Sequence, residues 1–154
     1  MPTSGEKTVA KNRKAGRDYF LEDRLEAGIV LFGTEIKSIR ASQVSLNEAY
    51  VKVERGEAWL VNAYIAPYDP ASQFNHDPRR IRKLLLHRRE INRLEEKVKQ
   101  RGYTLVPTKM YMKHHRAKLE FALARGKRKY DKRQELAKKD AQREMERTLS
   151  RKNR

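Results

Sequence analysis

Four histidines and a complete lack of cysteine limit the catalytic chemistry open to this chain. Without cysteine there is no thiol nucleophile, no disulfide and no thiolate metal site. His76 is followed by Asp77 and then by Arg79, and a base, a carboxylate and a cation are groups that suit phosphodiester chemistry. A ribonuclease is therefore one hypothesis. Nothing in the sequence gathers these groups around a reacting phosphate, so binding is favoured over cleavage.

Other motifs of enzymes are incomplete or missing. Gly28 and Gly33 have the spacing of a phosphate-binding loop, but the Lys-Ser/Thr pair that must follow is absent. No Gly-x-Ser-x-Gly occurs. His114 and His115 are adjacent at the tip of an expected hairpin, where their side chains should diverge and a metal would need further ligands. We therefore expect no enzyme activity, no cofactor, no metal ion and no small-molecule substrate.

The charge of the chain indicates its partner. It carries 37 Lys/Arg against 20 Asp/Glu, a net charge of +17 and a pI near 10.3. At that charge the phosphate backbone of a nucleic acid is the expected partner, because each neutralised phosphate releases counterions. An anionic membrane is the rival partner, but no lipidation motif or long apolar run supports it. The lack of a secretory signal and of cysteine favours the cytoplasm.

Basic charge is concentrated at the two ends of the chain. Residues 125–154 hold 13 Lys/Arg against 5 Asp/Glu, and residues 1–18 hold 5 against 2. After Tyr130 the large apolar side chains are Leu136, Met145 and Leu149, in one narrow stripe. That is too little apolar surface to offset the entropy of ordering. We expect a basic arm (1–18), a folded body (19–124) and a tail (125–154) that is disordered when free and helical on RNA.

The body is predicted to be mainly β with helices, an α+β fold. Apolar runs and alternation predict strands, while 3.6-residue spacing predicts helices. The expected strands are 19–21, 28–32, 46–53, 58–65, 103–112 and 118–124; the expected helices are 35–41, capped by Thr34, and 88–101; residues 66–80 are an expected loop. Short strands in one small body favour an OB-like β-barrel with flanking helices.

A series of motifs, read together, resembles one bacterial family. In chain order they are NRKA at 12–15, EAGIVL at 26–31, GTEIKSIR at 33–40, NHDP at 75–78, RKLLL at 82–86, GYTLVP at 102–107 and ARGKRKYDKR at 124–133. The chain resembles the SmpB family of SsrA-binding proteins along nearly its whole length, from about residue 12 to the end.

The resemblance implies an RNA-binding protein that is not an enzyme. The family has an OB-like barrel with helices at its side and a basic tail. It binds the tRNA-like domain of transfer-messenger RNA, assists its alanylation and delivers it to stalled ribosomes in trans-translation, or ribosome rescue. The barrel stands in for the missing anticodon arm at the decoding centre, and the tail becomes a helix in the empty mRNA channel of the small subunit. We expect the protein to act as a monomer.

The candidate binding residues combine the basic patches with positions that the resemblance implies. For RNA binding they are Asn12, Arg13, Lys14, Glu26, Lys37, Arg80, Arg82, Lys83 and Leu85. For the ribosome-binding tail they are Gly126, Lys127, Arg128, Tyr130, Asp131, Lys132, Arg133 and Leu149.

Several of these assignments have a structural alternative. Glu26 either accepts from a base edge or forms a salt bridge within the body, for example with Arg24. Leu85 either packs beneath the RNA or belongs to a core strand, and Phe20 is interpreted as core. The basic residues after the NHDP motif contact RNA or line a solvated strand edge, and the charges of the arm clamp phosphates or only solubilise a disordered terminus.

Two departures from the family pattern stand out. The expected hairpin tip, 113–116, contains no Gly, so we expect a wider loop there. Thr148 is polar where an apolar residue is usual, which leaves Leu149 to make that contact. The alternative function is a generic ribosome-associated RNA-binding protein or RNA chaperone without specific RNA choice. Composition does not separate the two, whereas the ordered motifs favour the specific partner.

Overall fold

The computed structural model describes residues 6–68, 74–100, 102–127, 142, 143 and 145. Its strands are β1 (Glu6–Lys11), β2 (Tyr19–Ile29), β3 (Val44–Ser45), β4 (Tyr50–Glu54), β5 (Glu57–Val61), β6 (Tyr64–Ile65), β7 (Arg82–Leu85), β8 (Tyr103–Lys113) and β9 (Arg116–Gly126). Its helices are α1 (Arg13–Asp18), α2 (Gly33–Arg40) and α3 (Arg88–Lys99). None of the helices in these ranges is long and apolar enough to cross a membrane.

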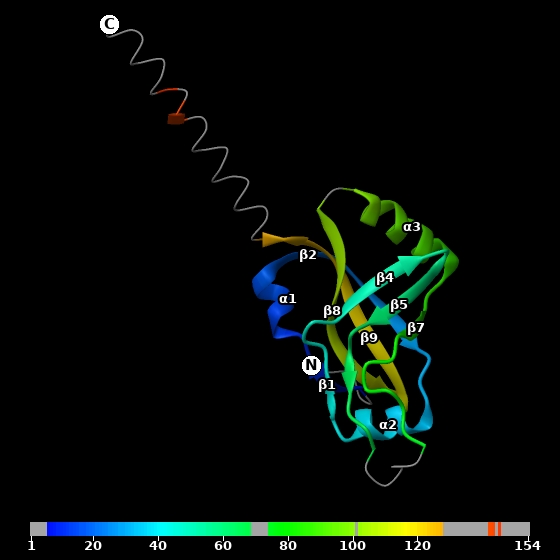
Figure 1. Ribbon diagram of the computed structural model, residues 1–154. Helices are drawn as coiled ribbons and strands as arrows, with labels where there is room; N and C mark the ends of the chain where they lie inside the picture. The colour runs from blue at the N-terminus through cyan, green and yellow to red at the C-terminus, as the bar shows by residue number, and fades with distance from the viewer. Residues whose placement is uncertain (1–5, 69–73, 101, 128–141, 144, 146–154) are drawn as a thin grey trace, which may run out of the picture.

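Six strands close into a ring. They pair antiparallel in the order β8-β4-β5-β7-β2-β9, and β9 pairs again with β8. β1 pairs with the C-terminal half of β8, and β3 pairs with β6 in a separate two-stranded sheet. The helices lie outside the ring, with α2 and α3 at opposite ends and α1 at one side (Figure 1). The predicted α+β, OB-like fold is confirmed.

Apolar side chains fill the inside of the ring. Residues that alternate along the strands are almost fully buried, because successive side chains point to opposite faces. The largest of them are Leu60, Leu84, Leu105, Met110, Leu119 and Phe121. Together they form one core cluster, which Ile39 joins from α2 and Leu94 joins from α3. The two end helices therefore seal the ring as well as flank it.

The described part of the predicted basic arm is held against the body. β1 pairs with β8 along its length, and the backbone N–H of Asn12 donates to the carbonyl of Thr108 at 2.8 Å. In α1, Ala15 is buried against Val106 and Ala124. For residues 6–18, the alternative of a disordered terminus is therefore excluded. Neither element was predicted, because each is a single short, polar segment with one buried side chain.

The segment from Tyr19 to Ile29 forms one long strand, where the sequence predicted two short apolar runs. Polar residues between the runs lie on both sides of β2, with Asp23 toward α3 and Glu26 on the outer face, and the pairing with β9 shifts register between Leu21 and Arg24. The predicted strand 58–65 is instead divided into β5 and β6, with Asn62 between them at a φ of 64°. Alternation alone did not show either the bulge or the break.

The two predicted helices are present, with shifted ends. α2 begins after Phe32, whose backbone N–H donates to the Glu35 carboxylate at 2.8 Å. Thr34, predicted as the cap, makes a hydrogen bond to His76 instead. α3 starts in the same manner, with Glu90 accepting from the backbone N–H of His87 at 3.0 Å. An acceptor at the third helical position satisfies one of the free N–H groups at each start.

Candidate RNA interface

The basic run after the NHDP motif is built around a buried carboxylate. Glu35 of α2 is fully buried, and its two oxygens accept from Arg80 at 2.5 Å and from Arg82 at 2.6 Å. The Arg82 side chain is also fully buried, and it donates to the carbonyls of Ala63 at 2.7 Å and Pro78 at 3.1 Å. This cluster ties α2, β7 and the segment before β7 together.

The ionisation of this cluster is fixed by its hydrogen bonds. Burial raises the pKa of Glu35, but hydrogen bonds from Arg80, from the Phe32 backbone and from Arg82 outweigh it, so that this pKa lies below its ordinary value of 4.5. Burial lowers the pKa of Arg82, while Glu35 opposes that shift. Near neutral pH the cluster is a carboxylate held between two guanidinium groups, one of them completely enclosed.

The predicted RNA contact by Arg82 needs a correction. Its side chain has no exposed surface, so it acts on any RNA only through the fold. Arg80 is three-quarters buried, donates to the carbonyl of Val30 at 3.2 Å and stacks over the ring of Phe32, with 4.0 Å from its guanidinium carbon to the ring centre. Sequence reasoning missed Glu35 as their partner, because the carboxylate and the two arginines meet only in the tertiary structure.

The NHDP motif is also structural. The Asn75 side chain bonds both backbone groups of Tyr68, at 2.9 and 2.8 Å, and so closes the loop between them. Asp77 accepts from the backbone N–H of Arg79 at 2.9 Å. His76 is buried, with Nε2 2.9 Å from the carbonyl of Ile65 and Nδ1 2.9 Å from the Thr34 hydroxyl. A carbonyl only accepts, so Nε2 carries the proton and Nδ1 accepts from Thr34. Neither nitrogen is free to act as the base of a ribonuclease.

Glu26 lies on the outer face of the ring. Its side chain is 41% exposed, and its Oε2 accepts from the Tyr111 hydroxyl and lies 3.7 Å from the Lys113 ammonium. The predicted alternative partner, Arg24, is instead 3.7 Å from Glu120. Among the described residues Oε1 has no hydrogen-bond partner. The carboxylate is thus held in position by one oxygen and presents the other to solvent.

Tyr111 stays protonated and serves as the donor to Glu26. Burial, then the hydrogen bond and the charge of Glu26, raise its pKa well above the ordinary value of 10.0. Glu26 and Glu120 are direct partners on β2 and β9, and two like charges in that position repel. Glu120 is satisfied by the Thr108 hydroxyl at 2.5 Å and by Arg24. Hydrogen bonds and ion pairs therefore hold both carboxylates of this acidic face in position. Sequence reasoning missed Tyr111 and Glu120 because they meet Glu26 only across strands.

Leu85 is a surface residue. Its side chain is 54% exposed, whereas its neighbour Leu84 is 1% exposed, so the leucine run alternates between the outer face and the core. A Cβ on Gly28, its partner across β2, would lie 3.3 Å from the Cβ of Leu85. The absence of a side chain at Gly28 lets Leu85 lie flat on the strand. Lys83, on the same face, pairs with Glu57 at 3.3 Å and remains half-exposed.

Asn12 holds the start of α1 to β8. Its side-chain amide donates to the carbonyl of Pro107 at 2.8 Å, while Oδ1 is buried without a partner among the described residues. Arg13 is exposed and has no ion pair there, and Lys14 pairs with the exposed Glu48 at 2.9 Å. These three predicted residues are consecutive and form a second patch beside that of Glu26: Asn12 bonds the backbone of Thr108, whose hydroxyl donates to Glu120, the partner of Glu26 across β2 and β9.

Lys37 belongs to a third patch, at the start of α2. Its ammonium is 5.3 Å from the ring centre of Tyr68. The side chains of Phe32 and Phe74 are 53% and 84% exposed, and with Lys37 they line one open hollow. Tyr64 is also partly exposed, beneath the guanidinium of Arg79. Exposed rings beside cations are the parts of a base-stacking surface.

The tail leaves the body beside α1. Gly126, the last residue of β9, pairs with Tyr19, and the Lys127 ammonium donates to the carbonyl of Gly16 at 3.0 Å. Lys127 also lies 5.2 Å from the ring centre of Phe20, which is 43% exposed, so the prediction of Phe20 as core was wrong. The other predicted tail residues lie outside the described residues: Arg128, Tyr130, Asp131, Lys132, Arg133 and Leu149.

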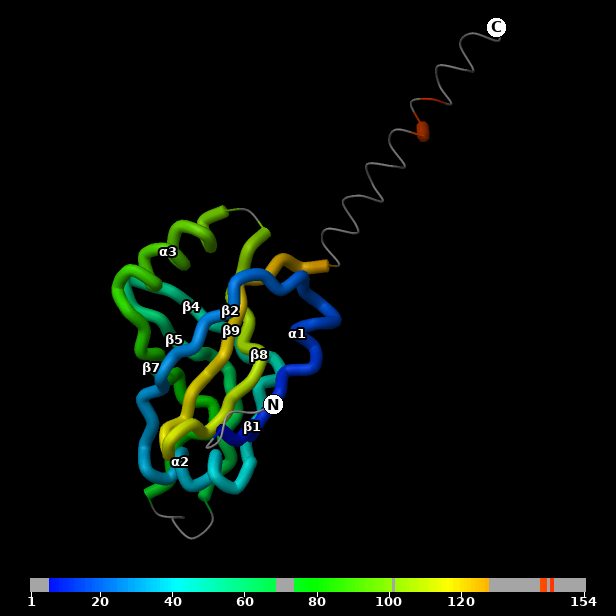
Figure 2. Tube along the Cα trace, turned by 180° about the vertical axis from the view of Figure 1, so that it is seen from behind, coloured from blue at the N-terminus to red at the C-terminus, as the bar shows by residue number. Residues whose placement is uncertain are grey.

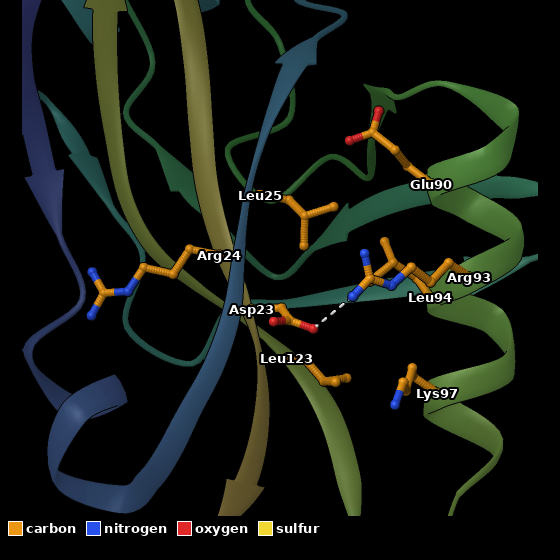
Figure 3. Close-up of a pocket in the computed structure, with 8 residues that line it drawn as sticks. All are labelled: Asp23, Arg24, Leu25, Glu90, Arg93, Leu94, Lys97 and Leu123. Atoms are coloured by element: carbon orange, nitrogen blue, oxygen red, sulfur yellow. Dashed lines mark hydrogen bonds and ion pairs between the residues drawn. The ribbon is translucent and has the colours of Figure 1, made fainter.

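A cleft lies between β2 and α3, and Glu90 and Lys97 of α3 are among the residues that line it (Figure 3). Leu25, Leu94 and Leu123 line it, and its main charged feature is an ion pair of 3.1 Å between Asp23 and Arg93, while Arg24 points away from it. Within the described ranges no group of three or more His, Asp or Glu side chains is placed to hold a metal ion.

Comparisons with known proteins agree on one family. The profile described as "SmpB protein" matches residues 9–151. The SsrA-binding protein of Lysinibacillus sphaericus (strain C3-41) is 53% identical over 153 residues, which covers 99% of each chain. That of Geobacillus thermodenitrificans (strain NG80-2) is 54% identical over 149 residues, 97% of this chain and 96% of the relative. A solved structure described as "tmRNA-SmpB: a journey to the center of the bacterial ribosome" matches with a TM-score of 0.65 and 51% identity, covering 76% of this chain and 82% of that one.

Proposed function

Because the chain belongs to the SmpB family, we propose that it binds transfer-messenger RNA and acts with it on stalled ribosomes in trans-translation. The observation that carries the proposal is the similarity over almost the full length, at more than half identity, to proteins named for binding SsrA RNA. The proposed role is binding rather than catalysis. Because ribosomes are cytoplasmic, the protein acts in the cytoplasm.

We assign the tRNA-like domain of the RNA to the outer face around Glu26 and Leu85. What supports this is a half-exposed carboxylate with one unpaired oxygen, next to an exposed leucine and to Lys83. A carboxylate oxygen accepts hydrogen bonds from the amino group of a base, and an exposed apolar side chain packs against a sugar or a base. Phosphate contacts from the cations around them then position the RNA.

We assign the ribosome to the opposite end of the body, where α1 and the start of the tail lie together. β9 runs from the hairpin tip at Arg116 to Gly126, a distance of about 34 Å at the usual rise of a strand. One molecule can therefore hold the RNA near one end of β9 and send a basic tail from the other. This division supports the expectation of a barrel at the decoding centre and a tail in the mRNA channel.

The first test is a binding titration at one near-physiological salt concentration. It compares the tRNA-like domain of transfer-messenger RNA with an elongator tRNA of similar length. A preference of about tenfold or more, about 1.4 kcal/mol, is recognition beyond charge and supports the proposal. Equal affinities for the two RNAs would mean that the net charge of +17 alone explains the binding, and would favour a generic RNA chaperone.

A second test separates body from tail. Deletion of residues 131–154 is expected to leave binding of the tRNA-like domain largely intact and to abolish peptide tagging on stalled ribosomes. The matched control is the same chain with the tail present and Glu26→Ala, which is expected to lose RNA binding first. Equal loss of both activities in the deletion would contradict the division between the two ends.

A further inference from the structure

The tip of the β8–β9 hairpin forms one wall of a basic pocket. Its six lining residues are Lys7, Val9, Arg40, Met112, His114 and His115, around a volume of about 470 Å³. They come from β1, from the last turn of α2 and from the hairpin tip, three segments that both views place together at one end of the ring (Figures 1 and 2). Val9 and Met112 form an apolar floor, and the four charged or titratable side chains are exposed.

The polar side chains of this pocket are unpaired, and two of them, Lys7 and Arg40, are cations. In the described part of the chain, Lys7, Arg40, His114 and His115 make no side-chain hydrogen bond, ion pair or ring contact, and no lining residue is acidic. The β2–α3 cleft differs, because its Arg93 is paired with Asp23. Cations gathered without a carboxylate repel one another, so the pocket is electrostatically suited to an anion.

Two non-glycine residues at the tip have a left-handed backbone conformation. His114 and His115 have φ values of 49° and 65°, and Lys113 pairs directly with Arg116. The turn is thus a two-residue one with both residues left-handed, and the expected wider loop is wrong. Glycine or Asn-Gly fits such a turn with little strain, whereas histidine adopts this backbone less readily. The corresponding turn between β4 and β5 uses Arg55 and Gly56, with φ of 52° and 74°.

We propose that this pocket binds a backbone phosphate of the tRNA-like domain, with Lys7 and Arg40 supplying charge and the His114 and His115 imidazoles supplying hydrogen-bond donors. Arg and Lys are the usual phosphate partners, and an imidazole donates one hydrogen bond when neutral and two when protonated. The proposal rests on the proposed function. It also explains why the turn carries imidazoles where Asn-Gly would be less strained.

The same hairpin joins the pocket to the face assigned to transfer-messenger RNA. Lys113, the residue before the turn, is the cation beside Glu26. Gly126, where the tail begins, lies at the other end of β9, about 34 Å away at the usual rise of a strand. The pocket is therefore nearer to the Glu26 face than to the start of the tail. For that reason we assign the phosphate to transfer-messenger RNA and not to the ribosome.

The test uses the full chain with His114→Asn and His115→Gly together. Asn-Gly is the favoured sequence for this turn, so the variant keeps the hairpin and is expected to be at least as stable in urea. Its affinity for the tRNA-like domain is expected to fall about three- to tenfold. The slope of log affinity against log salt should flatten by about one in the Lys7→Ala, Arg40→Ala double variant. The matched control is Arg55→Asn, which creates Asn-Gly at the other hairpin and removes one exposed cation.

The outcomes distinguish this site from the function it rests on. Suppose that the unaltered chain prefers the tRNA-like domain to an elongator tRNA, and that the His114→Asn, His115→Gly variant binds the tRNA-like domain equally well. That result overturns the phosphate site and leaves the proposed function intact. No preference in the unaltered chain defeats the proposed function itself. An equal loss of affinity for the tRNA-like domain in Arg55→Asn would mean that net charge, and not the pocket, explains the weaker binding. Weakened binding to ribosomes, with the tRNA-like domain unaffected, would overturn the assignment to transfer-messenger RNA.

Discussion

Glu35 and Glu26 are each held by side chains from other segments, yet their surroundings are opposite. Glu35 is fully buried between Arg80 and Arg82, and Glu26 is 41% exposed beside Tyr111 and Lys113. At the buried site of Glu35, a missing partner leaves a charge that water does not reach. On the outer face, water replaces whatever is removed. The first carboxylate is therefore tied to the stability of the fold, and the second is available to a partner.

The comparison also explains why a count of basic residues misleads. Arg82 and Lys83 are adjacent on β7, but their side chains point to opposite faces, one into the core and one to solvent. In the sequence both belong to one basic run. In the structure only Lys83 has surface that an RNA can contact.

The largest expected effect is the loss of Arg82. Arg82→Ala should lower the free energy of unfolding by about 3–5 kcal/mol, because it leaves Glu35 charged and partly unpaired in the core. Urea denaturation measures this directly. Lys83→Ala is the matched control, since its partner Glu57 is exposed and such pairs contribute about 1 kcal/mol or less. Similar losses in the two variants would contradict the contrast between core and surface.

The next largest expected effect is on how the free energy of unfolding falls at acid pH, the acid limb of the stability profile. The pKa of Glu35 is lower in the folded chain than its ordinary value of 4.5, so the unfolded chain binds the proton more readily. The stability from this carboxylate is complete above that value and is lost as the pH falls through the lower, folded pKa. Urea denaturation at a series of pH values should show a shallower acid limb for Glu35→Gln, which is also less stable at neutral pH.

Glu48 provides the exposed control for that experiment. A hydrogen bond and the charge of Lys14 lower its pKa as well, but the pair lies in solvent. Screening by water should make Glu48→Gln nearly indistinguishable from the unaltered chain at every pH. An acid limb changed as much by this variant as by Glu35→Gln would mean that burial does not decide the outcome.

The sequence predicted most strands of the ring, though not β7, and the two end helices, because their patterns are local. Alternation along 103–112 and 118–124, and the spacing of Ile91 and Leu94, are visible without tertiary structure. The resemblance supplied Glu26 and Leu85. What could not be predicted depends on contacts between distant segments: Glu35 with Arg82, Glu26 with Tyr111 and β1 with β8. Whether a charged side chain is buried depends on those contacts, and a hydropathy pattern does not report it.

Glu26→Ala is expected to act on RNA rather than on the fold. The affinity for the tRNA-like domain should fall about tenfold, about 1.4 kcal/mol, although the variant gains a positive charge. The free energy of unfolding should change by about 1 kcal/mol or less. Glu57→Ala, which also removes one exposed acid, is the control and should bind RNA slightly more tightly. Tighter binding by Glu26→Ala would make Glu26 only an electrostatic penalty.

The smallest expected effect is that of Tyr111→Phe, which removes the donor to Glu26 and keeps the ring. The loss of one hydrogen bond should cost about 1 kcal/mol at neutral pH. Because the pKa of Tyr111 is raised in the folded chain, its contribution is complete below the ordinary value of 10.0 and is lost as the pH rises towards the folded pKa. The difference in stability between Tyr111→Phe and the unaltered chain should therefore narrow in alkaline solution. Tyr103→Phe, whose ring lies beneath Arg125, is the control and should show no such narrowing. If the difference stayed constant with pH, the hydrogen bond to Glu26 would not be what fixes Tyr111, and the outer carboxylate would not be held in place for a partner.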